Sequence, residues 1–210
     1  IRMGMSNGYK LNEKTKEITA YHEAGHAITG LFLKECDPVH KVNIIPRGMG
    51  LGVTMSVPEE DMVLYSEAYL KSKISMLLGG YCAEKKFIGS RTTGASNDIE
   101  KVTEIARTMI MKCGLSKNLL PFNYQEYNSL EEGSITLSED VKHKVFKEIE
   151  DLITEQMEVT FNILEEYRNV VEKMVEMLLE KETIGEGDIL KILQDCQIEQ
   201  EKIPSYLFQK

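Results

Sequence analysis

Apolar side chains recur at three- and four-residue spacing in several stretches of the chain, which is the spacing of one helix face. The first stretch covers residues 12–34 and ends before Asp37-Pro38. A second runs from Ser66 to about Phe87, and a third runs from Asn97 to Cys113, where Gly114 closes it. We therefore expect three helices in the first 125 residues.

The second half of the chain continues the helical pattern, and one short stretch of the first half interrupts it. Leu137-Ser138-Glu139-Asp140 has the residues of a helix start, helical stripes follow over 145–179, and a last short helix is expected near Asp188–Leu193. Residues 39–57 instead hold two strand-like runs around a turn with Pro and Gly. The expected fold is mainly α, with one small β element, a hairpin or short sheet, beside the first helix.

Charge is distributed unevenly over the 210 residues, a length that suffices for one compact domain or two small ones. Residues 1–125 carry 16 Lys and Arg and 13 Asp and Glu, a net charge of +3, whereas residues 126–210 carry 9 and 21, a net charge of −12. Nucleic-acid binding needs clustered Lys and Arg, so the acidic second half disfavours it.

The sequence predicts neither a membrane span nor a disulfide framework. The longest stretch without a charged residue, Gly48–Pro58, has 11 residues, whereas a membrane-spanning helix needs about 20. The start of the chain has no signal-peptide apolar region. Because the chain begins with Ile, we expect it to be part of a longer protein. Free, mostly buried thiols in a reducing compartment are expected, because no Cys-x-x-Cys pair occurs among Cys36, Cys82, Cys113 and Cys196.

The strongest chemical signal is His22-Glu23-Ala24-Gly25-His26, an H-E-x-x-H motif on the first expected helix. A spacing of four residues puts both imidazoles on one helix face, one turn apart, where both can bind one zinc ion. Glu23 is then the candidate general base that takes a proton from a zinc-activated water. Residues 1–125 are therefore the expected zinc-binding catalytic half, and residues 126–210 are an acidic helical half of the same domain.

A catalytic zinc site usually has a third protein ligand. His40 enters a strand-like run and His143 lies in the acidic half, so surface or capping roles are favoured for both. The remaining candidates are Glu84, late in the second helix, and Asp98, which follows Asn97, the expected N-cap of the third helix. The residue pattern leaves the choice between these two carboxylates open.

Several segments, in order along the chain, resemble the FtsH family of membrane-bound, ATP-dependent zinc metalloproteases. They are Thr19–Ala27 around the zinc motif, Asp37–Val42, Ile44–Gly48, Leu51–Thr54, Gly79-Gly80, Ala83-Glu84, Thr93–Ile99 and Glu182–Ile184. The resemblance covers nearly the whole chain and implies the peptidase domain of such a protein. No Walker A sequence, G-x-x-x-x-G-K-[ST], occurs in the chain, so the ATPase module and the membrane anchor are expected outside it.

The resemblance also implies roles for residues, cofactors and partners. Asp98 is implied as the third zinc ligand beside His22 and His26, and Glu84 as the residue that orients a ligand. One Zn²⁺ per chain is the implied cofactor, and ATP acts only through the missing module. The implied partners are unfolded polypeptide substrates and further copies in a homo-hexamer. The implied location is a bacterial inner membrane, a mitochondrion or a plastid, with this part of the protein itself soluble.

The expected function is that of a zinc-dependent endopeptidase. An extended substrate is expected to pair with the candidate strand formed by Gly50, Leu51, Gly52, Val53 and Thr54, and a plain hairpin strand is the alternative. One alternative function is a non-catalytic assembly subunit, which the intact site residues disfavour. Another is a small-substrate zinc hydrolase, which would have a narrow, closed pocket. The resemblance implies that the acidic helices of 139–193 pack between protomers, and packing within one chain is the alternative.

Overall fold

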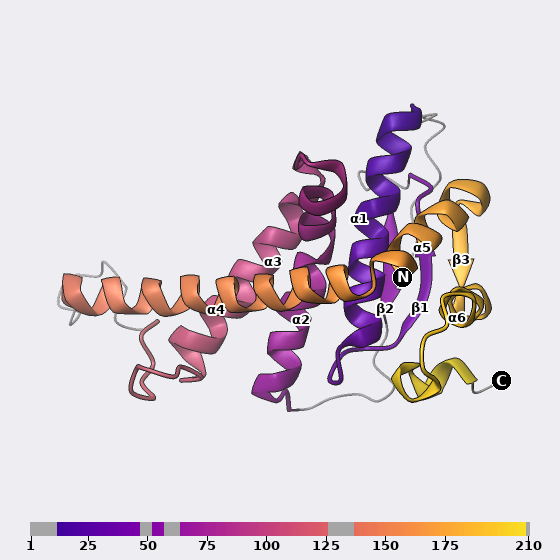
Figure 1. Cartoon of the computed structure of the whole chain (residues 1–210). Helices are drawn as coiled ribbons and strands as arrows, with labels where there is room; N and C mark the ends of the chain where they lie inside the picture. Colours follow the sequence, from indigo (N-terminus) through magenta and orange to yellow (C-terminus); the bar gives the residue numbers. More distant parts are fainter. Residues whose placement is uncertain (1–11, 47–51, 57–63, 126–136, 209–210) are drawn as a thin grey trace.

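A computed structural model describes residues 12–46, 52–56, 64–125 and 137–208. This part of the chain forms six α-helices and three short strands (Figure 1). Their bounds are α1 Glu13–Phe32, β1 Val39–Asn43, β2 Val53–Ser56, α2 Glu67–Ala83, α3 Ser96–Arg107, α4 Glu139–Glu166, α5 Arg168–Lys181, β3 Thr183–Gly185 and α6 Glu186–Asp195. The mainly helical fold with a small β element is therefore confirmed.

Side-chain caps fix the starts of three of the helices. The side chain of Asn12 accepts a hydrogen bond from the backbone N–H of Thr15 at the start of α1. Ser66 and Ser138 cap α2 and α4 in the same way. Each cap satisfies a backbone donor that the first helical turn leaves without a partner. The helix starts expected at Ser66 and Ser138 are confirmed.

The expected N-cap of the third helix is wrong. The helix α3 begins at Ser96, its N-cap position is Ala95, and no side chain caps it. A short 3-10 turn, Thr93–Ala95, runs directly into α3, and the side chain of Thr92 caps that turn instead. Asn97 and Asp98 therefore lie inside the first turn of α3. This turn carries the Asp98 carboxylate at the positive end of the helix dipole.

The three strands form one antiparallel sheet in the order β2-β1-β3. Val42 of β1 pairs with Thr54 of β2 on one side and with Ile184 of β3 on the other. The sequence pattern indicated β1 and β2 but not β3, because three residues are too few to show an alternation of apolar and polar side chains. Pairing with β1 therefore creates β3.

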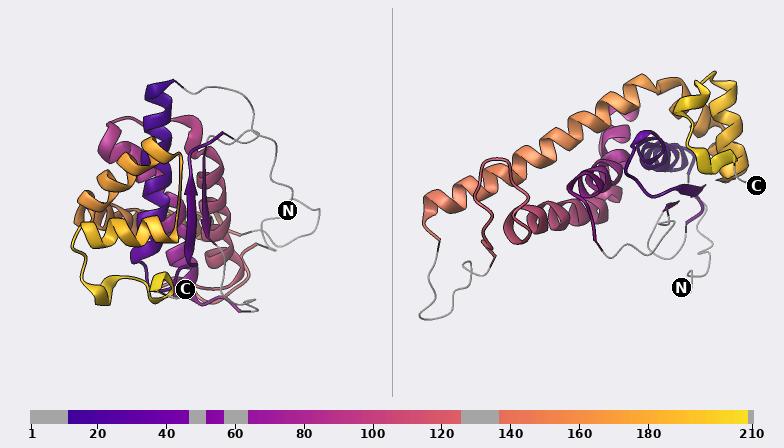
Figure 2. Two further views of the ribbon diagram at one scale, coloured as in Figure 1. Left: turned by 90° about the vertical axis from the view of Figure 1, so that its right-hand side faces the viewer. Right: turned by 90° about the horizontal axis from the view of Figure 1, so that it is seen from below.

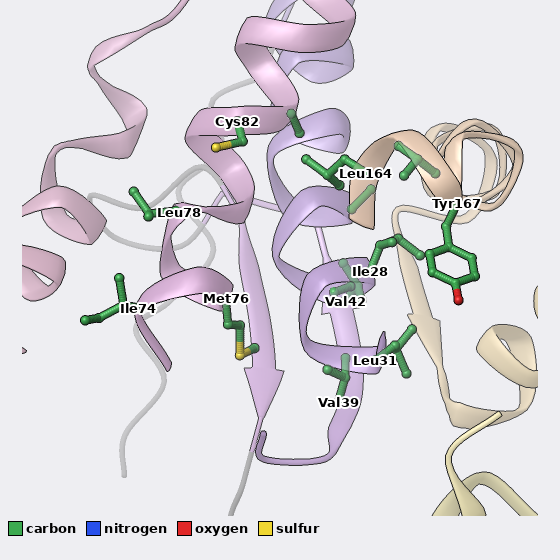
Figure 3. Packing of buried hydrophobic residues seen from close by; sticks show 14 of the residues in the cluster. Ile28, Leu31, Val39, Val42, Ile74, Met76, Leu78, Cys82, Leu164 and Tyr167 are labelled. Atoms are coloured by element: carbon green, nitrogen blue, oxygen red, sulfur yellow. The ribbon is translucent and has the colours of Figure 1, made fainter. Parts of the chain in front are cut away.

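The helix α1 is the centre of the molecule. Figure 2 shows α1 between the sheet on one side and α4 and α5 on the other. Its residues from Thr19 to Leu31 are buried on every face except that of Tyr21. Ile28 and Leu31 pack there among side chains from β1 and α2 and Leu164 of α4 (Figure 3). Burying one such side chain contributes about 1.5–3 kcal/mol.

The acidic helices pack within the chain. In α4 and α5 the apolar stripe is buried, with Val145, Ile149, Leu164, Val171 and Leu178 all in the common core. Helix α4 crosses α2, and α5 packs against α1 (Figure 1). This stripe therefore has its partners in the same chain, as in the single-chain alternative. The division at residues 125 and 126 stays a prediction, as do contacts of other faces with further copies.

The burial of the cysteine thiols differs from the expectation. Of the four thiols only Cys82 is buried; Cys36 and Cys196 are half-buried and Cys113 is exposed, so the expectation of mostly buried thiols is wrong. They are all free, as expected. None of the helices in the described ranges combines the length and the apolar character that a membrane span requires.

Candidate metal centre and active site

The H-E-x-x-H motif lies in the buried middle of α1. His22, Glu23 and His26 are 9%, 6% and 8% exposed. The Nε2 atoms of the two histidines lie 3.0 Å apart, as helical spacing of four residues predicts. Three polar side chains are therefore held in a core helix, where unpaired polar groups are costly.

Asp98 closes a triangle with the two imidazoles. Its Oδ2 lies 3.3 Å from Nε2 of His22 and 3.4 Å from Nε2 of His26. Within the described part of the chain, these three residues are the group of His, Cys, Asp or Glu side chains arranged to hold a metal ion. Ligand atoms at 2.0–2.2 Å from a tetrahedral zinc ion lie roughly 3.3–3.5 Å from each other. The two distances to Asp98 fit that spacing, and the 3.0 Å between the two imidazole nitrogens is slightly shorter.

The other ring nitrogens fix which tautomer each histidine adopts when neutral. Nδ1 of His26 lies 2.8 Å from the carbonyl oxygen of Met76, which can only accept a hydrogen bond, so Nδ1 is the donor. Nδ1 of His22 lies 2.7 Å from Oε1 of Glu84, and a carboxylate also only accepts. In both neutral rings the lone pair of Nε2 then points into the triangle, where a metal ion would bind it.

Glu84 lies behind His22 and not in the triangle. It is 1% exposed and begins the π-helical turn Glu84–Ile88 that follows α2. Its Oε2 accepts a hydrogen bond from the backbone N–H of Thr92 at 2.6 Å, while Oε1 faces His22. The structure therefore places the two open candidates differently: Glu84 at Nδ1 of His22 and Asp98 at Nε2.

The charges of this cluster depend on one another. Burial alone lowers the pKa of His22, but hydrogen bonds to Asp98 and Glu84 outweigh it and raise the pKa to about 9. Burial raises the pKa of Asp98, and hydrogen bonds from His22 and His26 reverse this, so its pKa lies below the ordinary value. The pKa of Glu84 is lowered in the same way, against the effect of burial, by His22 and Thr92. The metal-free site thus holds two carboxylates around a cationic ring, and a bound cation would replace the proton.

Glycines give the site its close contacts. A Cβ atom at Gly80 of α2 would lie 2.5 Å from Nε2 of His22, so only glycine leaves room for the ring. Gly25 and Gly79 face each other where α1 crosses α2, and a Cβ on either would meet the main chain of the other. The Gly79-Gly80 pair therefore allows the close approach of α1 and α2.

A groove of about 1390 Å³ runs past the triangle. It is lined by α1, β2, α2, the segment 92–98 and α3, with His22, Glu23, His26 and Asp98 in its wall. Gly52, Val53 and Thr54 of the candidate substrate strand also line it, whereas Gly50 and Leu51 lie outside the described residues. Within those residues β2 pairs only with β1, so its outer edge has no strand partner there.

The remaining histidines lie elsewhere. His40 is in β1, and its Nδ1 is 2.6 Å from Oε1 of Glu186 at the start of α6. His143 lies exposed on α4. Sequence reasoning missed Met76, Thr92 and Thr54 as partners of the site. No sequence signal identifies a main-chain carbonyl such as that of Met76, whereas Thr92 stands directly before the segment Thr93–Ile99 that carries the family resemblance.

A mainly helical domain that buries an H-E-x-x-H motif beside a carboxylate defines the class of zinc-dependent peptidases. Comparison with known protein families shows which family of this class the chain belongs to. The model of peptidase family M41 matches residues 9–192. The chain therefore belongs to peptidase family M41.

Curated relatives agree with this family. The chain is 40% identical over 200 residues to the ATP-dependent zinc metalloprotease FtsH of Rubrobacter xylanophilus, a match that covers 90% of the chain and 30% of the relative. It is 41% identical over 192 residues to the protein of the same name from Thermotoga maritima, with 88% of the chain and 32% of the relative covered. The chain thus spans about 30% of the length of these relatives.

Proposed function

We propose that the chain is a zinc-dependent endopeptidase domain that hydrolyses peptide bonds in unfolded polypeptides. The observation that carries the proposal is the triangle of His22 Nε2, His26 Nε2 and Asp98 Oδ2, with edges of 3.0, 3.3 and 3.4 Å. These three residues would hold the ion, and Glu84 would keep the ring of His22 in place. When bound, zinc supplies Lewis-acid polarisation of the scissile carbonyl and lowers the pKa of the attacking water.

Glu23 is the proposed general base. It lines the groove next to the two histidines. Its carboxylate takes a proton from the attacking water as the new carbon–oxygen bond forms, and then gives that proton to the leaving amine nitrogen as the carbon–nitrogen bond breaks. The carboxylate therefore returns to its starting state after each cleavage.

The outer edge of β2 is the proposed binding site for the substrate backbone. An extended chain would add to the sheet beside β2 through main-chain hydrogen bonds, which tolerate many side chains. The exposed side chain of Val53 (48%) and the groove volume of about 1390 Å³ support an extended substrate over a small molecule. These features disfavour the narrow pocket expected of a small-substrate hydrolase.

We also propose that the chain acts as one part of a longer, ATP-dependent, membrane-anchored protein. The names of its relatives include both ATP dependence and zinc. In that protein an ATPase module would deliver unfolded polypeptides to the groove, and copies would assemble as a homo-hexamer, as the resemblance implies. The non-catalytic alternative has no specific observation in its favour.

The proposed activity is tested with zinc-loaded chain and a permanently unfolded protein, such as reduced and alkylated lactalbumin, with fragments identified by mass spectrometry. Glu23→Gln should keep its zinc and lower kcat by about 10²–10⁴-fold, the usual contribution of a general base. Glu17→Gln is the matched control, because Glu17 is exposed on the same helix. Zinc-loaded wild type that cuts nothing, or Glu23→Gln as active as wild type, would overturn the proposal.

A further inference from the structure

The Glu23 carboxylate lies against strand β2 and is held there by one side chain. The hydroxyl of Thr54 is 2.7 Å from Oε2 of Glu23 and 3.1 Å from the main-chain oxygen of the same residue. A hydroxyl has one proton to donate, and the charged carboxylate at the shorter distance is the stronger acceptor. Thr54 therefore donates to Oε2.

The other carboxylate oxygen, Oε1, lies beside Gly52. Among the described residues no group donates a hydrogen bond to Oε1 of Glu23. Gly52 lies beside it, and a Cβ atom at that position would come within 2.6 Å of Oε1 and 2.7 Å of Cγ. Thr54 of β2 and Gly52, just before that strand, thus fix the carboxylate from one side. Thr54 binds one oxygen, and the missing side chain of Gly52 leaves space for the other.

We propose that Thr54 is a positioning residue for the general base, and that its hydroxyl keeps Glu23 oriented for proton transfer. This inference rests on the proposed function. It assigns Thr54 a role different from substrate pairing, because its side chain reaches α1, whereas strand pairing with a substrate uses main-chain groups at the outer edge of β2. The neighbouring Val53 has its side chain on the opposite face of the strand.

The rate of proton transfer depends strongly on the position of the Glu23 carboxylate. A general base must lie within hydrogen-bond reach of the proton that it takes, and a displacement of about 1 Å can cost on the order of 100-fold in rate. Without the Thr54 hydroxyl, nothing else in the described residues binds either oxygen of the Glu23 side chain. The loss should therefore appear in kcat and not in substrate binding.

The test compares Thr54→Val, which has the same shape without the hydroxyl, with Thr54→Ser, which keeps the hydroxyl. In zinc-loaded chain, Thr54→Val should lower kcat about 10- to 100-fold with unchanged KM, and Thr54→Ser should recover most of it. In a Glu23→Gln background Thr54→Val should have no further effect, because the residue acts through Glu23. Thr103→Val is the matched control, since Thr103 is an exposed threonine of α3.

A crystal structure of zinc-loaded Thr54→Val supplies a readout that does not depend on activity. It should show the Glu23 carboxylate displaced from its position beside β2, while Thr54→Ser keeps it there. A raised KM with unchanged kcat, a lower zinc content, or an undisplaced Glu23 would each overturn the inference. If wild type cuts nothing although zinc is bound, the proposed function fails, and the position of Glu23 in the Thr54→Val structure still decides this inference.

Discussion

Replacing Gly80 by alanine should weaken zinc binding strongly while the chain stays folded. The new Cβ atom would lie 2.5 Å from Nε2 and Cε1 of His22 and 2.6 Å from its Nδ1. Non-bonded atoms of this kind rest about 3.5 Å apart, so the ring must move by on the order of 1 Å. Zinc ligand distances tolerate only about 0.2 Å.

The expected loss of zinc affinity follows from the displacement of the His22 ring. Changes that only disturb the orientation of a ligand cost about 10- to 100-fold in metal affinity, and a displaced ligand atom belongs at the upper end, near 100-fold. The strain of the added methyl group is expected to cost about 1–3 kcal/mol of the free energy of unfolding. A typical domain has about 5–15 kcal/mol of stability, so the variant should remain folded.

The assay is competition for Zn²⁺ between the chain and a chromophoric chelator at pH 7, with circular dichroism to check folding. Gly185→Ala is the matched control, because a Cβ atom at Gly185 would meet nothing within 4 Å, and it should bind zinc as tightly as wild type. A folded Gly80→Ala chain with wild-type zinc affinity would refute the placement of the His22 ring in the metal site.

Two further predictions concern the support of the site. Glu84→Gln keeps the shape of the side chain but loses the charge that faces Nδ1 of His22. In the same competition assay zinc affinity should therefore fall about 10- to 100-fold. An unchanged affinity would contradict the role of Glu84 in orienting His22. Gly25→Ala would place a Cβ atom on the main chain of Gly79, which cannot move aside as a flexible side chain can. Urea unfolding of the metal-free chain should therefore show that the free energy of unfolding falls by about 3 kcal/mol or more. A fall of less than about 1 kcal/mol would contradict this close helix crossing.

The sequence predicts the parts of this molecule that depend on local spacing. The helix starts at Ser66 and Ser138 follow from capping chemistry, and the two imidazoles of His22 and His26 share a face because four residues make about one turn. The mainly helical class follows from the same periodicity. These features need only the residues within one or two turns of each other.

The choice between Glu84 and Asp98 could not be made from the residue pattern, because both carboxylates reach the same ring. A histidine has two nitrogens, and only the three-dimensional path of the chain decides which nitrogen each carboxylate meets. The π-helical turn after α2 brings Glu84 to Nδ1, and the first turn of α3 brings Asp98 to Nε2. The contact of Thr54 with Glu23 depends on tertiary structure in the same way.

The N-cap predicted for α3 is wrong, and the sequence pattern does not predict strand β3, for a related reason. Asn97 and Glu100 have the residue types of a capping pair, but the preceding 3-10 turn already supplies the helical geometry, so the N-cap position is Ala95, two residues before Asn97. Strand β3 is three residues long and exists because β1 offers it an edge. Local preference was overridden by the neighbouring structure at both places.

The zinc content of the wild-type chain and of Asp98→Ala decides whether His22, His26 and Asp98 form a zinc site. Elemental analysis would follow purification without chelators and reconstitution with zinc. We expect about one Zn²⁺ per wild-type chain, as for a single site with three protein ligands, and a clear loss in folded Asp98→Ala. A wild-type chain that binds no zinc, or a folded Asp98→Ala chain that retains all of it, would show that these three residues do not form the site.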